Sequence, residues 1–247
     1  MSIGERAINP NDSFSLPRAL FRKLVHLCSY HFILKRDRTT STEVAGLELT
    51  ILPSVFHPKV FVTSGFFAHF LQSLDLAGKS VVEVGTGSGV LSLSAAKAGA
   101  SSVLALDINP AAVKAAQLNA ERNGLQQVRA LESNLFSAVP ASSQFDVIIS
   151  SPPSFAGEPR DAADRAWHAG PGYRDIVPLF TQAAPRLKPD GRMYLLLSSD
   201  TNLALFDSLI AAAGFISQRI ATRSIWIEAF YLYELRLNGA ASASAAN

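Results

Sequence analysis

Short apolar runs alternate with amphipathic stretches over most of the chain. The apolar runs predict strands at residues 80–84, 102–107, 127–133, 145–150 and 192–198. Between them, apolar positions recur at helical spacing at 92–100, 109–124 and 174–191, each with a glycine at or near its end. This alternation predicts an α/β fold, a mainly parallel sheet with helices on both faces.

The last part of the pattern changes. After a predicted helix at 201–214, two strands at 215–224 and 227–237 follow each other with no helix between them. Strands joined this briefly run antiparallel. The full prediction is therefore a seven-stranded, mostly parallel sheet that ends in a C-terminal antiparallel hairpin.

The two ends of the chain differ from this core. Residues 1–53 are predicted to form an N-terminal extension with a basic amphipathic helix at 16–36 and a short strand at 46–53. That helix can pack as a lid, bind an acidic partner or lie on a membrane surface. The main domain is expected to span 54–237, and the small, polar tail at 238–247 to be disordered.

Composition narrows the class of protein. The 247 residues are 48% hydrophobic and 17% charged, typical of a soluble globular protein, and the net charge of +2 is too small to indicate nucleic-acid binding by itself. Cys28 is the only cysteine, which excludes an internal disulfide and a multi-cysteine zinc site and fits a cytoplasmic location. No secretory leader, membrane-spanning segment or metal site is expected.

A glycine turn is the strongest chemical signal. The strand at 80–84 leads into Gly85, Gly87 and Gly89, and a helix follows at once. Glycines at such a corner allow a tight turn and let a ligand approach the backbone. The spacing is neither the dinucleotide fingerprint nor a phosphate-binding loop, so an anionic ligand is not required.

Polar residues at the ends of the next strands suggest a nucleoside. Asp107 lies 20 residues beyond Gly87 and can accept hydrogen bonds from ribose hydroxyls; the alternative is a helix cap, which Asn109 could provide equally well. Asn134 can accept from an adenine amine, and Leu135 and Phe136 can flank the ring. With Glu83 near the amino-acid end, the set favours S-adenosylmethionine over NAD.

The motifs at 81–93, 103–124 and 132–139, with the corner at 150–154, resemble class I S-adenosylmethionine-dependent methyltransferases. The closest likeness is to the small-domain group that includes release-factor glutamine and ribosomal RNA guanine-N2 methyltransferases, and it runs from about residue 52 to 237. It implies a Rossmann-like fold with the cofactor at a switch point between the first and fourth strands of the core. It also implies three further cofactor neighbours, Thr86, Ile108 and Asn109. The segment at 54–67 is similar to the group's pre-domain segment and adds Phe56, His57 and Ser64 to the cofactor and substrate site.

The corner Ser151-Pro152-Pro153-Ser154 departs from the group's pattern of Asn or Asp, Pro, Pro, then an aromatic residue. In the group, the first side chain and the first proline's carbonyl orient the acceptor nitrogen, and the aromatic residue stacks on the substrate. Here Ser151 replaces the amide and Ser154 the aromatic ring, although Phe155 follows. Asn134 is a milder departure, since the group more often has aspartate there.

A long irregular connection at 155–175 follows the corner, and such loops often carry function. Trp167 or Tyr173 can supply the missing stacking surface. His168 can act as a general base or be an ordinary solvated residue.

The sequence predicts a methyltransferase that acts on a nitrogen of a small molecule or a protein side chain. Transfer to oxygen or carbon, RNA N-methylation and a non-catalytic cofactor-binding protein remain alternatives. Oligomeric state is not indicated.

Overall fold

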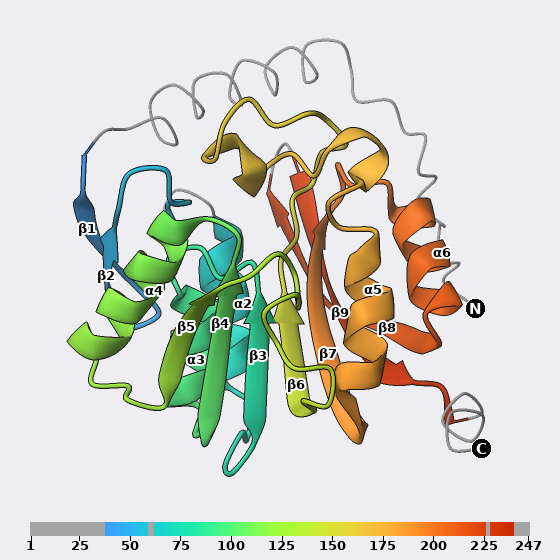
Figure 1. Cartoon of the computed structure of the whole chain (residues 1–247), viewed down its shortest axis with the longest axis horizontal. Helices are drawn as coiled ribbons and strands as arrows, with labels where there is room; N and C mark the ends of the chain where they lie inside the picture. The colour runs from blue at the N-terminus through green and yellow to red at the C-terminus, as the bar shows by residue number, and fades with distance from the viewer. Residues whose placement is uncertain (1–37, 59–61, 226–227, 240–247) are drawn as a thin grey trace, which may run out of the picture.

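A computed structural model describes residues 38–58, 62–225 and 228–239. Its main feature is a seven-stranded sheet in the order β5-β4-β3-β6-β7-β9-β8 (Figure 1). The strands are β3 (Ser80–Val84), β4 (Ser102–Asp107), β5 (Val128–Glu132), β6 (Phe145–Ser150), β7 (Leu187–Ser198), β8 (Phe215–Ile225) and β9 (Glu228–Leu237). The first five are parallel and the last two form an antiparallel hairpin against β7. The predicted fold class is confirmed.

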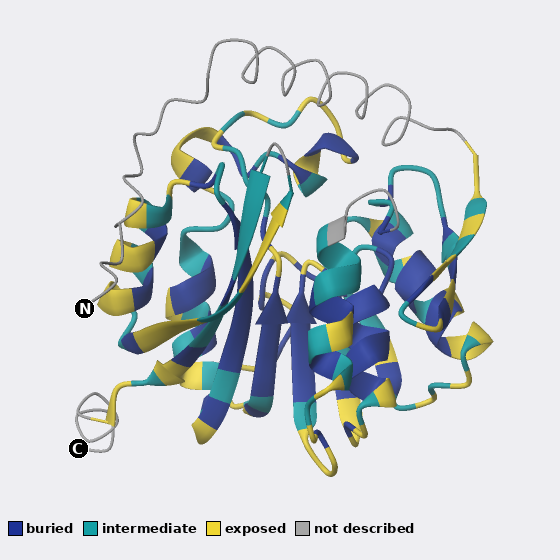
Figure 2. Ribbon diagram, turned by 180° about the vertical axis from the view of Figure 1, so that it is seen from behind, coloured by how far each residue is buried: buried dark blue, intermediate teal, exposed yellow. Residues whose placement is uncertain are grey.

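Helices cover both faces of the sheet (Figure 1). They are α2 (Val62–Gln72), α3 (Val90–Lys97), α4 (Pro110–Arg122), α5 (Pro178–Ala183) and α6 (Leu203–Ala212). Because side chains alternate across a strand, neighbouring residues pack into different hydrophobic cores, one on each face of the sheet. Val81 packs in a cluster with α2, α3 and α4, whereas Val82 packs with α5 and α6. The central strands are almost completely buried, and exposed residues collect on the edge strand β8 (Figure 2).

Two predicted boundaries are wrong. The helix expected at 174–191 ends at Ala183, and a 3₁₀ turn at Ala184–Arg186 follows it. Pro185 lacks the N–H that a continuing helix would use. β7 therefore begins at Leu187, five residues earlier than predicted.

A two-stranded hairpin lies beside α4. Its strands are β1 (Thr40–Val44), which was not predicted, and β2 (Leu47–Ile51), which confirms the predicted strand. Buried Asn119 of α4 joins the two parts: its Oδ1 accepts from Thr50 N at 2.7 Å, and its Nδ2 donates to Thr50 O at 3.0 Å and to Ser88 O at 2.9 Å. The hairpin is thus fixed next to the loop that follows β3. The domain boundary at residue 53 stays a prediction.

Several expectations concern residues beyond the described part. The predicted helix at 16–36 lies outside it, as does the predicted tail from residue 240 onward. Among the described helices, none is long and apolar enough to cross a membrane. In the same residues no group of three or more metal-ligating side chains gathers to hold a metal ion.

Candidate cofactor and acceptor site

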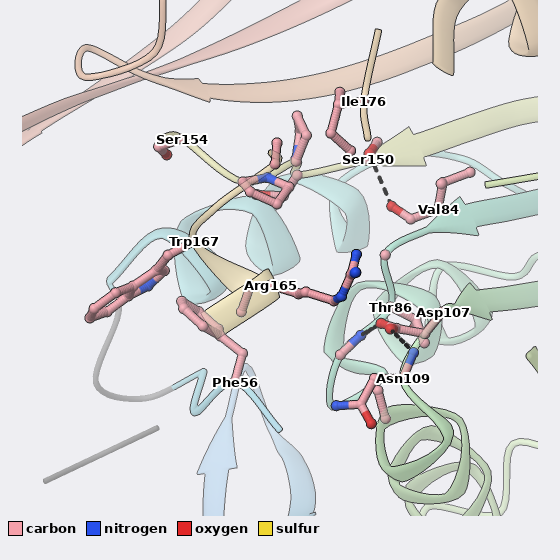
Figure 3. Close-up of a pocket in the computed structure, with 18 of the residues that line it drawn as sticks. Phe56, Val84, Thr86, Asp107, Asn109, Ser150, Ser154, Arg165, Trp167 and Ile176 are labelled. Carbon is pink, nitrogen blue, oxygen red and sulfur yellow. Dashed lines mark hydrogen bonds between the residues drawn. The ribbon is translucent and has the colours of Figure 1, made fainter. Parts of the chain in front are cut away.

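A cavity of about 510 Å³ opens at the carboxyl edge of the sheet, above the point where the chain order reverses between β3 and β6 (Figure 3). This volume lies within the range of about 300–1,000 Å³ typical of cofactor sites, and a switch point is where such folds bind ligands. Most of the predicted site residues line it: Phe56, Ser64, Glu83, Gly85, Thr86, Gly87, Asp107, Ile108, Asn109, Asn134, Leu135, Ser151, Pro152, Pro153, Ser154, Phe155, Trp167 and His168.

The glycine turn forms the floor between β3 and α3. Gly85 and Gly87 line the cavity with φ of 83° and 54°, in the left-handed region that favours glycine. Gly89 does not line the cavity, and its role as a cofactor neighbour stays a prediction. A Cβ at Gly89 would lie 2.9 Å from the Cα of Ala116, so this glycine lets α3 pack closely against α4.

Asp107 ends β4 and braces the glycine turn. Its Oδ2 accepts a hydrogen bond from Gly87 N at 2.8 Å, and its Oδ1 accepts from Asn109 N at 2.9 Å. Asn109 is the cap of α4, since its side chain accepts from Ala111 N at 3.0 Å. Asp107 is therefore not the cap and remains at the cavity wall, where burial raises the pKa of its carboxyl.

Glu83 is buried at the end of β3. Its Oε2 accepts from Thr86 Oγ1 at 2.7 Å, from Ser92 N at 2.9 Å and from the Ser92 hydroxyl. Burial nevertheless raises the pKa of Glu83 to about 7, because desolvation outweighs these hydrogen bonds. The carboxyl can gain or lose a proton near neutral pH when charge nearby changes.

Three residues after β4 and β5 border another side of the cavity. Ile108 is 42% exposed, an unusual position for a large apolar side chain, and Asn134 is exposed beside it in the cavity lining. Leu135 is buried with a φ of 50°. An apolar surface beside an exposed amide suits a flat, polar-edged ring.

The Ser-Pro-Pro-Ser corner leaves β6 beside the glycine turn. Ser150 Oγ donates to Val84 O at 3.0 Å, which ties the ends of β6 and β3 together (Figure 3). Pro152 is buried, whereas Ser151 is exposed in the cavity and its hydroxyl has no hydrogen-bond partner in the part of the chain that is described. The corner is rigid and presents a polar group to the cavity.

The covering loop, residues 155–175, closes one side of the cavity. Trp167 is 8% exposed and clusters with Phe56 and Phe155 (Figure 3). Tyr173 is a correction: it does not line the cavity, because its ring packs edge-on against Phe206 and its hydroxyl donates to Ser154 O at 2.9 Å. It braces the corner from behind. His57 is also absent from the cavity lining.

Charged residues that were not predicted complete the lining. Arg165 of the covering loop extends into the cavity, and its Nη1 lies 3.2 Å from Oδ2 of Asp175 (Figure 3). Glu228, at the start of β9, accepts a hydrogen bond from Ser198 Oγ at the end of β7. The hairpin prediction could have found Glu228, because an antiparallel strand begins where its parallel neighbours end.

Comparison with known proteins places this site in a family. The family of ribosomal protein L11 methyltransferases (PrmA) matches residues 63–151. A candidate protein N5-glutamine methyltransferase from Methanocaldococcus jannaschii is 33% identical over 164 residues, which cover 64% of this chain and 80% of the relative. The chain belongs to the class I S-adenosylmethionine-dependent methyltransferases.

Further comparisons agree with the methyltransferase assignment. The ribosomal protein L11 methyltransferase of Aeromonas salmonicida is 40% identical over 111 residues, which cover 44% of this chain and 37% of that protein. The chain thus spans just over a third of that relative's length. A T. thermophilus 16S rRNA N2 methyltransferase, solved with AdoMet and guanosine, is 25% identical with a TM-score of 0.60, over 81% of this chain and 50% of that chain. A methyltransferase from Pyrococcus furiosus shares the fold, with 23% identity and a TM-score of 0.57 over 89% and 96% of the two chains. The predicted cofactor, S-adenosylmethionine, is confirmed.

Proposed function

We propose that this methyltransferase transfers a methyl group to a nitrogen of a protein side chain held at the Ser-Pro-Pro-Ser corner. One observation carries the proposal: residues 151–154 border the same cavity as the glycine turn and Asp107. An acceptor at the corner and a cofactor on the turn would therefore share one enclosed space.

The cavity residues suit S-adenosylmethionine. Asp107 would accept hydrogen bonds from the ribose hydroxyls, Ile108 and Asn134 would border the adenine, and Glu83 would lie near the amino-acid end. The acidic side chains favour a cofactor that carries a sulfonium and an ammonium. When bound, the cofactor supplies an electrophilic methyl group on its sulfonium.

The corner would orient the acceptor. An amide nitrogen is a poor nucleophile because its lone pair is delocalised, so holding it in line with the methyl group is the main help that the protein can give. The Ser151 hydroxyl and the Pro152 carbonyl would accept hydrogen bonds from the nitrogen. Pro152 is buried, which keeps its carbonyl in place.

A protein acceptor is favoured over RNA on two grounds. The M. jannaschii relative, a candidate protein glutamine methyltransferase, is covered over 80% of its length. Among the residues that the structure describes, the cavity lining also contains four carboxyl groups, Glu83, Asp107, Asp175 and Glu228, against one arginine, Arg165, and this charge opposes entry of a phosphate-bearing chain. A cytoplasmic location stays a prediction.

The test is methyl transfer from labelled S-adenosylmethionine. A release factor, ribosomal protein L11, ribosomal RNA and a cell extract serve as acceptors, and mass spectrometry locates the modified atom. We expect label in a protein, on a side-chain nitrogen. Label only in RNA or only in small molecules, or on oxygen or carbon, would contradict the proposed acceptor. Failure to bind the cofactor at sub-millimolar concentration would remove the whole assignment.

A further inference from the structure

His168 lies directly beside the Ser-Pro-Pro-Ser corner. Phe155, the residue that follows the corner, pairs with it in a short parallel bridge. Phe155 N donates to Trp167 O at 2.9 Å, and Ala169 N donates to Phe155 O at 2.9 Å. The imidazole and the Phe155 ring lie 5.6 Å apart, and both side chains line the cavity. Backbone hydrogen bonds on both sides of His168 therefore fix it next to the acceptor position.

A buried carboxylate stands behind the imidazole. Asp164 is 0% exposed, and its Oδ1 lies 3.1 Å from His168 Nδ1. Arg160 holds the same carboxylate, with its Nε 2.8 Å and its backbone N 3.0 Å from Oδ2 and its Nη2 2.9 Å from Oδ1. Burial by itself would raise the pKa of Asp164, but the hydrogen bonds from Arg160 and the charge of His168 outweigh it and lower that pKa. Asp164 is therefore ionised at neutral pH.

This arrangement favours one tautomer of the imidazole. A carboxylate next to Nδ1 holds the proton of neutral imidazole on that nitrogen and leaves a lone pair on Nε2. Within the described residues Nδ1 is buried and makes no hydrogen bond, and the Asp164 Oδ1 atom at 3.1 Å is the carboxylate oxygen beside it; the side chain as a whole is 26% exposed. Gly157 makes room for the ring, since a Cβ there would lie 2.7 Å from Cδ2 of His168.

We propose that His168 accepts the proton released by the acceptor nitrogen during methyl transfer, and that Asp164 positions it. This inference rests on the proposed function. The nitrogen's lone pair forms the new bond to the methyl carbon, the bond from that carbon to sulfur breaks, and its electron pair stays on sulfur, giving S-adenosylhomocysteine. The N–H proton passes to Nε2 of His168 and from there to solvent.

Other charged groups share the cavity and bear on its pH dependence. Arg165 and Asp175 form an ion pair within the lining, and Glu228 borders the cavity from β9. Of these elements, only the covering loop supplies a carboxylate within 4.0 Å of the His168 ring in the described part of the chain, and that carboxylate is Asp164. Arg160, Asp164 and His168 could instead only hold the covering loop in place. The test therefore has to distinguish a structural role from that of a base.

The kinetic test compares His168→Gln and Asp164→Asn with wild type, using a release factor as acceptor. His69→Gln is the matched control, because His69 is exposed on α2 and does not line the cavity. We expect His168→Gln to lower kcat by about 100-fold with little change in KM or cofactor affinity. Asp164→Asn should lower kcat less and leave KM unchanged, because the imidazole stays in the cavity but loses the carboxylate that positions it. A purely structural role in the loop predicts instead a higher KM with kcat largely unchanged, and that result would overturn the proposal.

The second readout needs no turnover. In ¹⁵N NMR spectra, neutral His168 of the wild type should be the Nδ1–H tautomer, and Asp164→Asn should mix the two tautomers. A wild-type Nε2–H tautomer overturns the base assignment whatever the kinetics show. If wild type binds the cofactor but methylates no protein, the proposed function fails. If wild type and His168→Gln are equally active, only the base fails.

Discussion

Replacing Asp107 with alanine should weaken cofactor binding by about 1.5–3 kcal/mol, or roughly 10- to 150-fold in Kd. The range is that of hydrogen bonds to a charged group, here those that the ribose hydroxyls would donate. The carboxylate also accepts two backbone hydrogen bonds, one on each oxygen: from Gly87 N at 2.8 Å and from Asn109 N at 2.9 Å. Its loss therefore loosens the glycine turn as well, which places the expected effect toward the upper part of the range.

Calorimetry with S-adenosylmethionine and S-adenosylhomocysteine measures this effect. Both ligands carry the ribose and only one carries the sulfonium, so Asp107→Ala should weaken both by the same factor. Asp107→Asn should weaken binding too, because an amide has one acceptor oxygen and would leave either Gly87 N or Asn109 N opposite an NH₂ group. A larger loss for the sulfonium ligand would mean that Asp107 acts through its charge rather than through ribose.

Asp146→Asn is the matched control for a strand-end carboxylate. Asp146 lies at the opposite edge of the sheet and accepts from Ser80 N at 2.8 Å and Lys188 Nζ at 2.7 Å. This variant should lower the free energy of unfolding and leave the Kd unchanged. Unchanged affinity in Asp107→Ala, or an equal loss in Asp146→Asn, would refute the ribose role.

The other predictions concern four further positions in the chain. Ser151→Ala should lower kcat by about 10- to 100-fold with cofactor affinity nearly intact; equal loss of both would assign Ser151 to the cofactor or the fold. Because burial raises the pKa of Glu83 to about 7, binding of the cationic cofactor near pH 7 should release a proton, measured by calorimetry in buffers of different ionisation enthalpy, and Glu83→Gln should abolish that release. Because the pKa of Glu83 is raised in the folded state, the free energy of unfolding of the wild type should fall as the pH rises from 4.5 to about 7. Glu83→Gln should not show this fall. For Asp146, burial would raise the pKa, but the hydrogen bonds from Lys188 and Ser80 lower it to about 2; acid titration of wild type should lose up to about 2 kcal/mol of stability as the pH falls from about 4 to about 2, and Asp146→Asn should not. Gly89→Ala should destabilise the fold more than Gly85→Ala in denaturant unfolding, because only at Gly89 would the new Cβ meet Ala116 at 2.9 Å, whereas Gly85 has open space.

The positions of the strands, and of the polar residues that end them, followed from local patterns, whereas the switch point between the first and fourth strands came from the resemblance to class I methyltransferases. Apolar runs marked the strands, and each strand ended in a residue that could contact a nucleoside, such as Asp107 or Asn134. The carboxyl ends of parallel strands meet at one edge, so residues far apart in sequence could be placed together without a structure. The antiparallel hairpin was equally clear, because its strands are too close in sequence for a crossover.

The covering loop could not be predicted in the same way. Its residues lack a period, so nothing in the sequence separates a side chain that faces the cavity from one that faces the core. Tyr173 and Trp167 were equivalent candidates, but a φ of 60° at Tyr173 turns its ring toward Phe206. The packing role of Gly89 was not predictable for another reason: its close approach to Ala116 lies between α3 and α4, and the local motif carries no information about helix packing.

The corner now has a physical explanation that its sequence alone did not provide. Its two prolines and the Tyr173 hydroxyl hold the backbone from both sides, while Ser150 ties it to β3. Fixing a backbone costs about 1–2 kcal/mol per residue in conformational entropy, so a surface turn without a function does not need such rigidity. It is useful where a weak nucleophile must be held at one angle. A serine at position 151 then loses part of the fixed geometry that an asparagine would supply. His168 pairs with Phe155, the residue after the corner, and the backbone hydrogen bonds of Phe155 to Trp167 and Ala169 hold this proposed proton acceptor beside the corner.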